Sequence, residues 1–187
     1  METELNIDIM VEIQKGTDIK YKYDPIKKAI FCDKILSVSK YNQYNQGVIP
    51  NTLDENGNPL EVIILMDEPL LPGTYINCKF LGYLDTIENT KKNSIIIMCP
   101  SNKISKKYID FTDINNSTNI LKTNTREMIR HFIYEKKQIE EKKTVKVCEF
   151  YGRDDAIQVF IEALTKFSNK PKICSNKNKI TNYFEKI

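Results

Sequence analysis

The stretch Asn56–Glu61, NGNPLE, places three oxygen-bearing side chains at a tight turn in front of an apolar run. Three carboxylates at Asn56, Asn58 and Glu61 would suit phosphate chemistry with bound Mg²⁺, which prefers charged oxygen ligands. Asn offers only a neutral carbonyl and accepts a proton negligibly near neutral pH, so it cannot serve as a general base. Taken alone, the stretch is typical of an ordinary hairpin turn, because Asn and Gly tolerate left-handed backbone geometry.

The composition indicates one globular domain with a hydrophobic core. The chain has 187 residues, of which 41% are hydrophobic, and these suffice for a sizeable core. Arginine occurs only at Arg126, Arg130 and Arg153, while Lys, Asn and Ile are frequent. We interpret this as the coding bias of an AT-rich genome, such as that of a large DNA virus or a protist. The formal charge of +3 is the small difference between 28 basic and 25 acidic residues, so any basic site must be local.

The cysteines and the hydropathy pattern predict a cytoplasmic protein without a membrane segment. Five cysteines are spread along the chain without a C-x-x-C pair, which favours a reducing compartment. No run of about 18 apolar residues occurs, and the N-terminus lacks a basic segment before an apolar one. We expect Cys78 and Cys99 to be small buried hydrophobes, and His131 to pack in the core or at its boundary.

Strands are predicted for the first hundred residues and helices for the rest. Alternating apolar residues predict strands at 5–13 and 19–23, and apolar runs between Gly, Pro and Asn clusters predict more. These further runs cover 29–36, 61–66, 75–84 and 94–99. Strands followed by helices suggest a mainly β, α+β fold, a small barrel with helices packed outside it.

Two amphipathic helices and one more strand are predicted after residue 120. Thr125 is a plausible N-cap for a helix with Met128–Ile133 on its apolar face, and 144–150 resembles a strand. A second helix has its apolar face within Ala156–Phe167, and the preceding Asp154 and Asp155 fit its N-terminus.

Six separated segments occur in the order typical of soluble family I inorganic pyrophosphatases. They are MVEIQKGTDIKYKYD, CDKILS, NQGVIPNTLDENGNPLEV, PLLPGTYINCKFLGYL, HFIYEKKQIE and VKVCEFYGRDDAI. The chain resembles this family from about Val11 to about Phe167. The resemblance implies an OB-like five-stranded β-barrel with two C-terminal flanking helices, magnesium, hydrolysis of pyrophosphate to two phosphates, and a homo-oligomer. We expect residues 1–167 to form this domain and residues 168–187 to form a basic polar tail.

The resemblance implies a depleted metal site. The family segment D-x-D-P-x-D is replaced by NGNPLE, so Asn56 and Asn58 replace two aspartates and Glu61 a third. Asn58 stands at the water-activating position. The alignment also puts Glu88 and Asn93 at two metal-ligand aspartates. With Glu12 at a further acidic position of the family, the resemblance implies that Glu12, Glu61 and Glu88 are vestigial metal positions.

The resemblance also implies a set of phosphate-binding positions, at Lys20, Lys34 and Lys137. Lys34 replaces an arginine, and lysine is a poorer bidentate clamp for phosphate. Further departures from the family are Lys22 for a glutamate, Ile95 for a lysine, and Asn42, Gln46 and Lys136 for three pocket tyrosines. Counted over Lys22, Asn56, Asn58, Asn93 and Ile95, the changes make the pocket more positive than the family pattern by about four charge units.

Two hypotheses about function remain open. In the first, the chain is a catalytically inactive pseudoenzyme, retained as a phosphate-binding or structural and interaction module, with magnesium bound weakly or not at all. In the second, it is an active magnesium-dependent pyrophosphatase with a ligand set built on Glu12, Glu61 and Glu88. We favour the first, because losing a general base typically costs about a hundredfold to ten-thousandfold in rate, and metal ligands are missing as well.

The C-terminal ITNYF segment has the spacing of a sliding-clamp-binding peptide, with Ile180, Tyr183 and Phe184 as its apolar residues. A terminal helix turn docked on the barrel would use the same residues. If the segment binds a clamp, Tyr183→Ala with Phe184→Ala abolishes binding in calorimetry and leaves the melting temperature unchanged. A melting temperature lowered by several degrees would instead assign the tail to the domain's own core.

Overall fold

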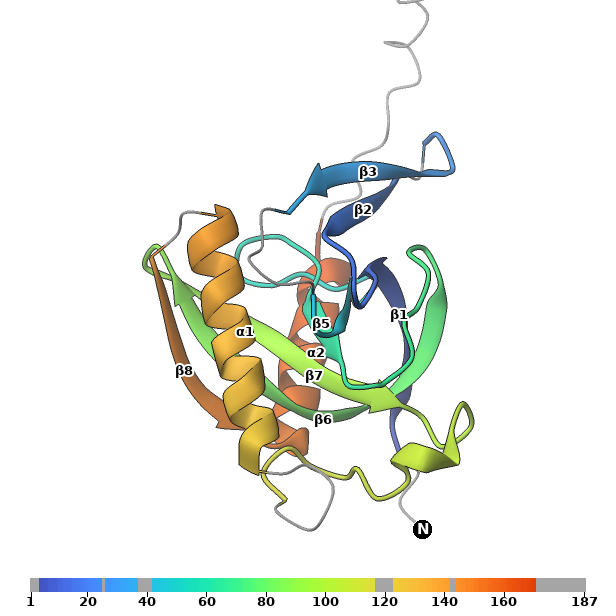
Figure 1. Ribbon diagram of the computed structural model, residues 1–187, viewed down its shortest axis with the longest axis vertical. Coiled ribbons are helices and arrows are strands. Elements are labelled where there is room, and N and C mark those ends of the chain that lie inside the picture. Colours follow the sequence, from blue (N-terminus) through green and yellow to red (C-terminus); the bar gives the residue numbers. More distant parts are fainter. Residues whose placement is uncertain (1–3, 25, 37–41, 117–122, 142–143, 171–187) are drawn as a thin grey trace, which may run out of the picture.

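The computed structural model describes residues 4–24, 26–36, 42–116, 123–141 and 144–170, which are built around one eight-stranded sheet (Figure 1). Its strands are β1 (Asn6–Ile13), β2 (Ile19–Asp24), β3 (Ala29–Ile35), β4 (Asn45–Val48), β5 (Glu61–Ile64), β6 (Tyr75–Glu88), β7 (Lys91–Pro100) and β8 (Val145–Tyr151). The helices are the 3₁₀ turn η1 (Lys106–Tyr108), α1 (Thr123–Glu141) and α2 (Arg153–Ser168). The ITNYF segment lies outside the described residues.

Five of the strands close into a ring. The sheet order is β3-β2-β1-β4-β5-β7-β6-β8, and an additional pairing of β1 with β6 closes the ring β1-β4-β5-β7-β6. Only β5 and β7 pair in parallel among the described strands. The predicted OB-like five-stranded barrel with two flanking helices is therefore confirmed. The β2–β3 hairpin and β8 extend the sheet beyond the ring on its two sides.

Strands β5 and β7 are buried on both faces, which explains their uninterrupted apolar sequences. One set of alternate residues packs with α2, and the other set packs with α1, so the two helices cover opposite faces of these strands (Figure 1). The first cluster contains Val62, Ile64, Ile96, Met98, Ala156, Phe160 and Ala163. The second contains Ile63, Leu65, Ile95, Ile97, Ile129, Phe132 and Ile133.

Three sequence predictions concerning single side chains have clear outcomes. Cys78 and Cys99 are buried, as predicted, and burial raises the pKa of the Cys99 thiol to about 12. The prediction for His131 was wrong, because its side chain is 67% exposed and its Nε2 lies 3.5 Å from Oε1 of Glu135 on the solvent side of α1.

The ends of the helices agree only partly with prediction. Helix α1 begins at Thr123, so Thr125 lies inside its first turn and is not the N-cap. Helix α2 carries Asp154 and Asp155 in its first turn, as predicted, and Oδ2 of Asp155 accepts a hydrogen bond from the Gly152 amide at 3.3 Å. Neither of these helices, nor any other in the described part of the chain, is long and apolar enough to cross a membrane.

Strand β4 was missed because its sequence, NQGV, has no apolar alternation although all four residues are buried. The buried side chain of Asn45 forms hydrogen bonds with backbone groups of neighbouring loops. Its Oδ1 accepts hydrogen bonds from the amides of Lys15 and Leu70, and its Nδ2 donates to the Glu68 carbonyl at 2.8 Å. Gly47 lies so close to β1 that an added Cβ would stand 2.2 Å from the Met10 carbonyl oxygen.

Gly47→Ala should therefore lower the free energy of unfolding by about 2 kcal/mol, because the Cβ would force β1 and β4 apart. Urea denaturation measures this change. Glu149→Ala, at an exposed position of β8, is the control and should change the stability by less than about 0.5 kcal/mol. Equal stabilities of the two variants would contradict the close approach of β1 and β4.

Candidate functional site

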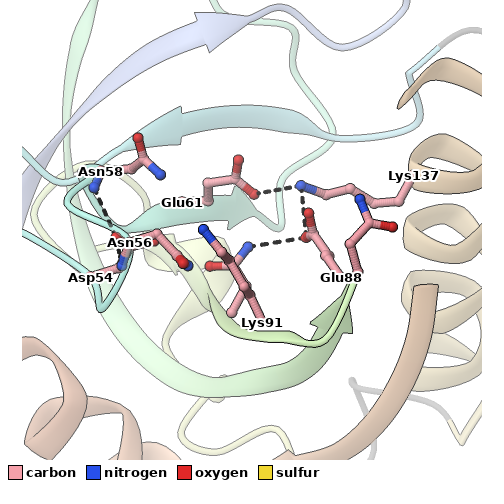
Figure 2. Close-up of a pocket in the computed structure, with 9 residues that line it drawn as sticks. Asp54, Asn56, Asn58, Glu61, Glu88, Lys91 and Lys137 are labelled. Atoms are coloured by element: carbon pink, nitrogen blue, oxygen red, sulfur yellow. Dashed lines mark hydrogen bonds and ion pairs between the residues drawn. The ribbon is translucent and has the colours of Figure 1, made fainter. Parts of the chain in front are cut away.

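A polar cavity of about 410 Å³ lies between the turn before β5, the β6–β7 hairpin and α1 (Figure 2). It contains all three of the predicted Asn positions, two of the predicted glutamates and one of the predicted lysines. Its lining residues are Asp54, Asn56, Asn58, Glu61, Glu88, Asn89, Lys91, Asn93 and Lys137. Side chains far apart in the sequence are thus brought together, and Asp54, Asn89 and Lys91 are additions that sequence reasoning did not place in the site.

A second, small cavity of about 20 Å³ adjoins the first, since Glu61 and Lys137 line both. Glu12 and Lys20 line this second cavity, and Nζ of Lys20 lies 3.3 Å from Oε2 of Glu12. Lys34 is opposite Lys20 in the β2–β3 pairing but is not among the lining residues of either cavity. Of the three predicted phosphate-binding lysines, one therefore lies in the main cavity, one in the small cavity, and one on the adjacent hairpin.

The ammonium group of Lys137 lies between two carboxylates of the cavity. Its Nζ is 3.2 Å from Oε2 of Glu61 and 3.0 Å from Oε1 of Glu88 (Figure 2). The Lys137 side chain is only 4% exposed. Because Lys137 belongs to α1, Glu61 begins β5 and Glu88 ends β6, this cluster joins the helix to the ends of two strands.

The apolar face of α1 explains why a lysine enters the pocket. Ile129, Phe132 and Ile133 pack into the core that faces this helix. Lys137 follows Ile133 by four residues and therefore lies one turn further along the same face. The hydrophobic packing of α1 thus fixes the direction in which the Lys137 side chain extends.

Glu61 carries a strongly stabilised negative charge. Burial raises the pKa of its carboxyl group, but the ammonium groups of Lys137, Lys136 and Lys20 together lower that pKa to about 2. Glu61 is consequently ionised at all pH values near neutrality. The buried charge of Lys137 therefore has a permanent counter-charge, although the Glu61 side chain itself remains 41% exposed.

Two of the three Asn side chains use their amide N–H groups as hydrogen-bond donors. Nδ2 of Asn56 donates to the carbonyl of Lys92 at 3.2 Å, and Nδ2 of Asn93 donates to Oε1 of Glu88 at 3.2 Å. An ionised aspartate has no donor and could make neither bond. The hydrogen bonds that Asn56 and Asn93 donate in this pocket therefore require an amide side chain.

The turn that carries Asn56 and Asn58 is organised by Asp54. Oδ1 of Asp54 accepts hydrogen bonds from the backbone amides of both residues, each at 2.8 Å, and Gly57 between them has φ of +81°. An Asp that accepts from amides a few residues ahead is a recognised turn signal, so Asp54 could have been found from the sequence.

The three positions at which the resembled family has tyrosines form one continuous hydrogen-bond chain. Nζ of Lys136 donates to Oε1 of Gln46, Nε2 of Gln46 donates to Oδ1 of Asn42 at 2.8 Å, and Nδ2 of Asn42 donates to the Thr17 carbonyl at 2.5 Å. Asn42 and Gln46 are buried. Buried polar groups are costly unless they are hydrogen-bonded. This chain of hydrogen bonds supplies partners for the buried side chains of Asn42 and Gln46.

The formal charges around the two cavities are balanced. Four carboxylates and four ammonium groups line them, contributed by Glu12, Asp54, Glu61, Glu88, Lys20, Lys91, Lys136 and Lys137. Within the described ranges, no group of three or more His, Cys, Asp or Glu side chains is placed to hold a metal ion. In this pocket the carboxylates Glu12, Glu61 and Glu88 are paired with ammonium groups of the chain itself.

Comparisons with known proteins identify the family and the fold of the chain. A family model described as inorganic pyrophosphatase matches residues 9–168. Inorganic pyrophosphatase from Nanoarchaeum equitans is 34% identical over 166 residues, which are 89% of this chain and 100% of that protein. Inorganic pyrophosphatase from Aquifex pyrophilus is 30% identical over 167 residues, covering 89% of this chain and 92% of that protein. The solved structure of an inorganic pyrophosphatase from Helicobacter pylori is similar, with a TM-score of 0.79 and 26% identity over 90% of this chain and 99% of that chain.

Lys137→Met should destabilise the protein by about 3 kcal/mol at neutral pH, because it leaves two carboxylates without their shared cation. The partial exposure of Glu61 moderates this loss. The lowered pKa of Glu61 contributes stability above about pH 4.5, which is lost as the pH falls toward about 2. The difference in stability between the parent protein and Lys137→Met should therefore be largest at neutral pH and shrink with acidification.

Urea denaturation at pH 7, 5 and 3 measures this pH dependence. Lys91→Met is the matched control, since Lys91 lines the same cavity from an exposed position and should alter the stability by less than about 0.5 kcal/mol. A loss for Lys137→Met that is the same at every pH would contradict the role assigned to Glu61.

Proposed function

Because the chain belongs to the inorganic pyrophosphatase family, we propose that it is a catalytically silent member, in which Asn56, Asn58 and Asn93 stand where the family pattern has aspartates. Its pocket would then bind phosphate or pyrophosphate-like anions without a divalent cation, and the protein would act as a binding or interaction module. The single observation that carries this proposal is that Asn56 and Asn93 act as amide donors, to the Lys92 carbonyl and to Oε1 of Glu88, at positions where the family pattern has metal-binding aspartates.

The donor set around Lys137 does not fit magnesium. Mg²⁺ requires near-octahedral oxygen ligands at about 2.0–2.1 Å and is usually held through carboxylates. Here Glu61 and Glu88 both face the ammonium of Lys137, and a divalent cation at the same oxygens would be repelled by that charge. Asn56 and Asn93 present amide donors to neighbouring acceptors, which leaves a ligand set poor in free anionic oxygen.

The absence of a general base supports the same proposal. Asn58 stands at the position where the resembled family activates water, and its amide does not accept a proton near neutral pH. Its backbone amide is held by Asp54 at 2.8 Å, and that carboxylate is already shared with the amide of Asn56. Asp54 serves the turn, which supports a structural role for it over proton transfer.

Lys20, Lys34 and Lys137 are the proposed phosphate-binding residues. Charge-assisted hydrogen bonds from ammonium groups to phosphate oxygens are the physical basis. Since Lys20 is paired with Glu12 and Lys137 with two glutamates, an anion has to compete with carboxylates inside the pocket. We therefore expect modest affinity that falls as the salt concentration rises. A homo-oligomer, which the family resemblance suggests, is part of the proposal and is tested by light scattering.

The purified protein should release phosphate from pyrophosphate, in the presence of magnesium, far more slowly than about 1 per second, the lower range for enzymes. Calorimetry at low salt with a chelator present should at the same time detect pyrophosphate binding. The competing hypothesis, an active enzyme using Glu12, Glu61 and Glu88, requires magnesium-dependent turnover at an enzymatic rate, and that result would falsify catalytic silence.

Restoring aspartates tests the metal site separately. Asn56→Asp, Asn58→Asp and Asn93→Asp together should lower the melting temperature without magnesium, because Asn56 loses its bond to the Lys92 carbonyl and a new carboxylate faces Glu88. Magnesium should restore the stability of this triple variant, since a ligand that binds the folded state stabilises it. The rate should remain low, because Lys22 and the missing tyrosines are unchanged.

The control for this experiment is the parent protein, whose melting temperature should not depend on magnesium at the same ionic strength. Sodium chloride at equal ionic strength separates metal binding from screening. A triple variant that gains no stability from magnesium would contradict the proposal that Asn in place of Asp at these three positions is what excludes the metal.

A further inference from the structure

The main cavity is large for the inorganic anions of the proposed function. Proteins bind small organic molecules in pockets of about 300–1,000 Å³, and this cavity, at about 410 Å³, lies within that range. A phosphate ion or pyrophosphate would fill only part of it. The turn before β5 forms one wall and the β6–β7 hairpin forms another (Figure 2), so a larger ligand would contact both.

The charges of the cavity walls do not favour a multiply charged anion. Three carboxylates line the cavity, against two ammonium groups. These are Asp54, Glu61, Glu88, Lys91 and Lys137. A polyanion gains little net attraction from walls of this composition, which agrees with the modest affinity expected for pyrophosphate. A tightly bound ligand therefore has to gain affinity from hydrogen bonds as well as from charge.

Carbonyl oxygens predominate among the amide groups that remain open to a ligand. Asn56 and Asn93 already use their Nδ2 groups for bonds inside the protein. Their Oδ1 atoms accept no hydrogen bond from any residue in the described part of the chain. The side-chain amide of Asn58 is exposed and forms no hydrogen bond to another described residue, so it offers both a carbonyl and an N–H group.

These open amides match hydroxyl groups better than phosphate oxygens. An ionised phosphate accepts hydrogen bonds and donates none, so it cannot pair with a carbonyl oxygen. A hydroxyl group both donates and accepts. A carbonyl that a ligand covers without offering a donor loses its bond to water, which costs binding free energy. The turn that carries Asn56 and Asn58 is therefore suited to a ligand with several hydroxyl groups.

One ammonium group of the cavity is open to an anionic group. Lys91 begins β7 at an exposed position, and Figure 2 shows its side chain extending into the cavity. It forms no ion pair with another residue that the structure describes, whereas Lys137 is paired with Glu61 and Glu88. Lys91 is thus placed to donate a charge-assisted hydrogen bond to a ligand.

We propose that this cavity binds a hydroxylated organic phosphate, that is, a monophosphate ester of a polyol or sugar. The phosphate lies at Lys91, and the hydroxyl groups lie at Asn56, Asn58 and Asn93. The inference rests on the proposed function, because it requires a pocket that takes a phosphate group without magnesium. It goes further by naming the organic part of the ligand, which the protein binds as an intact ester.

Two ligands that differ only in their hydroxyl groups test the inference. Glycerol 3-phosphate and propyl phosphate share a three-carbon chain and a phosphate group, and only the first has hydroxyl groups. Calorimetry uses the full-length protein at low salt with a chelator present. We expect glycerol 3-phosphate to bind at least about tenfold more tightly, because a site that bonds to a hydroxyl group discriminates against an analogue without it.

Two single variants separate the two parts of the ligand. Asn58→Leu should weaken glycerol 3-phosphate binding by about fivefold or more and change propyl phosphate binding by less than about twofold, since it removes only the amide. Lys91→Met should weaken both esters by about fivefold or more and preserve their ratio, since it removes the cation.

The matched control is Gln158→Leu, which removes an exposed amide on α2 that does not line this cavity. It should change neither affinity. Equal affinities of the two esters for the parent protein would overturn the inference, as would a preference for glycerol 3-phosphate that Asn58→Leu leaves unchanged. Circular dichroism and the melting temperature verify that each variant is folded.

Pyrophosphate, measured under the same conditions, separates this inference from the proposed function. If pyrophosphate binds and the two esters bind equally, the hydroxyl site is excluded and the anion pocket stands. If glycerol 3-phosphate binds through Asn58 and Lys91 while pyrophosphate does not bind, the hydroxyl site is supported and pyrophosphate is excluded as a ligand. If none of the three binds, both proposals fail.

Discussion

The buried ammonium group of Lys137 is the charge on which the pocket depends. It is contributed by α1, and both of its carboxylate partners stand at strand ends. A buried charge is tolerated only when it is paired and hydrogen-bonded. The helix, β5 and β6 are therefore constrained to one arrangement, and the ionised state of Glu61 follows from the three ammonium groups around it.

The neutral side chains of the pocket are consistent with that charge arrangement. Asn93 donates to the same Glu88 that pairs with Lys137, so the glutamate accepts from a cation and from an amide at once. The neighbouring Lys136 donates a hydrogen bond to Gln46, which in turn donates to Asn42. An aspartate at position 93 would lose the bond to Glu88, and a tyrosine at position 46 would replace the side chain that both accepts from Lys136 and donates to Asn42.

Sequence patterns predicted the barrel well because its strands follow simple rules. Alternation marked β1, and continuous apolar runs marked β5 and β7, which are buried on both faces. Strand β4 escaped prediction because its buried residues are polar or lack a side chain, and only tertiary contacts of Asn45 and Gly47 explain it. The start of α1 was also misplaced, since Thr125 resembles an N-cap in isolation.

The site was predictable as a list of positions and not as a network. The family resemblance predicted that Asn56, Glu61, Glu88 and Lys137 belong to one site, and all four line the same cavity. The hydrophobic periodicity of the sequence could not have predicted this. The partner of each ammonium group, and the direction in which each amide donates, depend on distances between segments that are remote in sequence. For the same reason the position of Lys34 outside both cavities could not be inferred.

The double pairing of β1 has a consequence for the order in which the chain folds. Asn6 in β1 pairs with Lys79 in β6, while Met10 and its neighbours pair with β4, so the ring closes only after a loop of some seventy residues has formed. Long-range closures of this kind are slow, because chain entropy is lost before the contacts are gained. Lys137 reaches Glu61 and Glu88 from a third segment of the chain, again across a long separation in sequence. We expect contacts of this kind to form late, and contacts formed after the rate-limiting step act mainly on the unfolding rate, so the charge cluster should lengthen the lifetime of the native state more than it speeds folding.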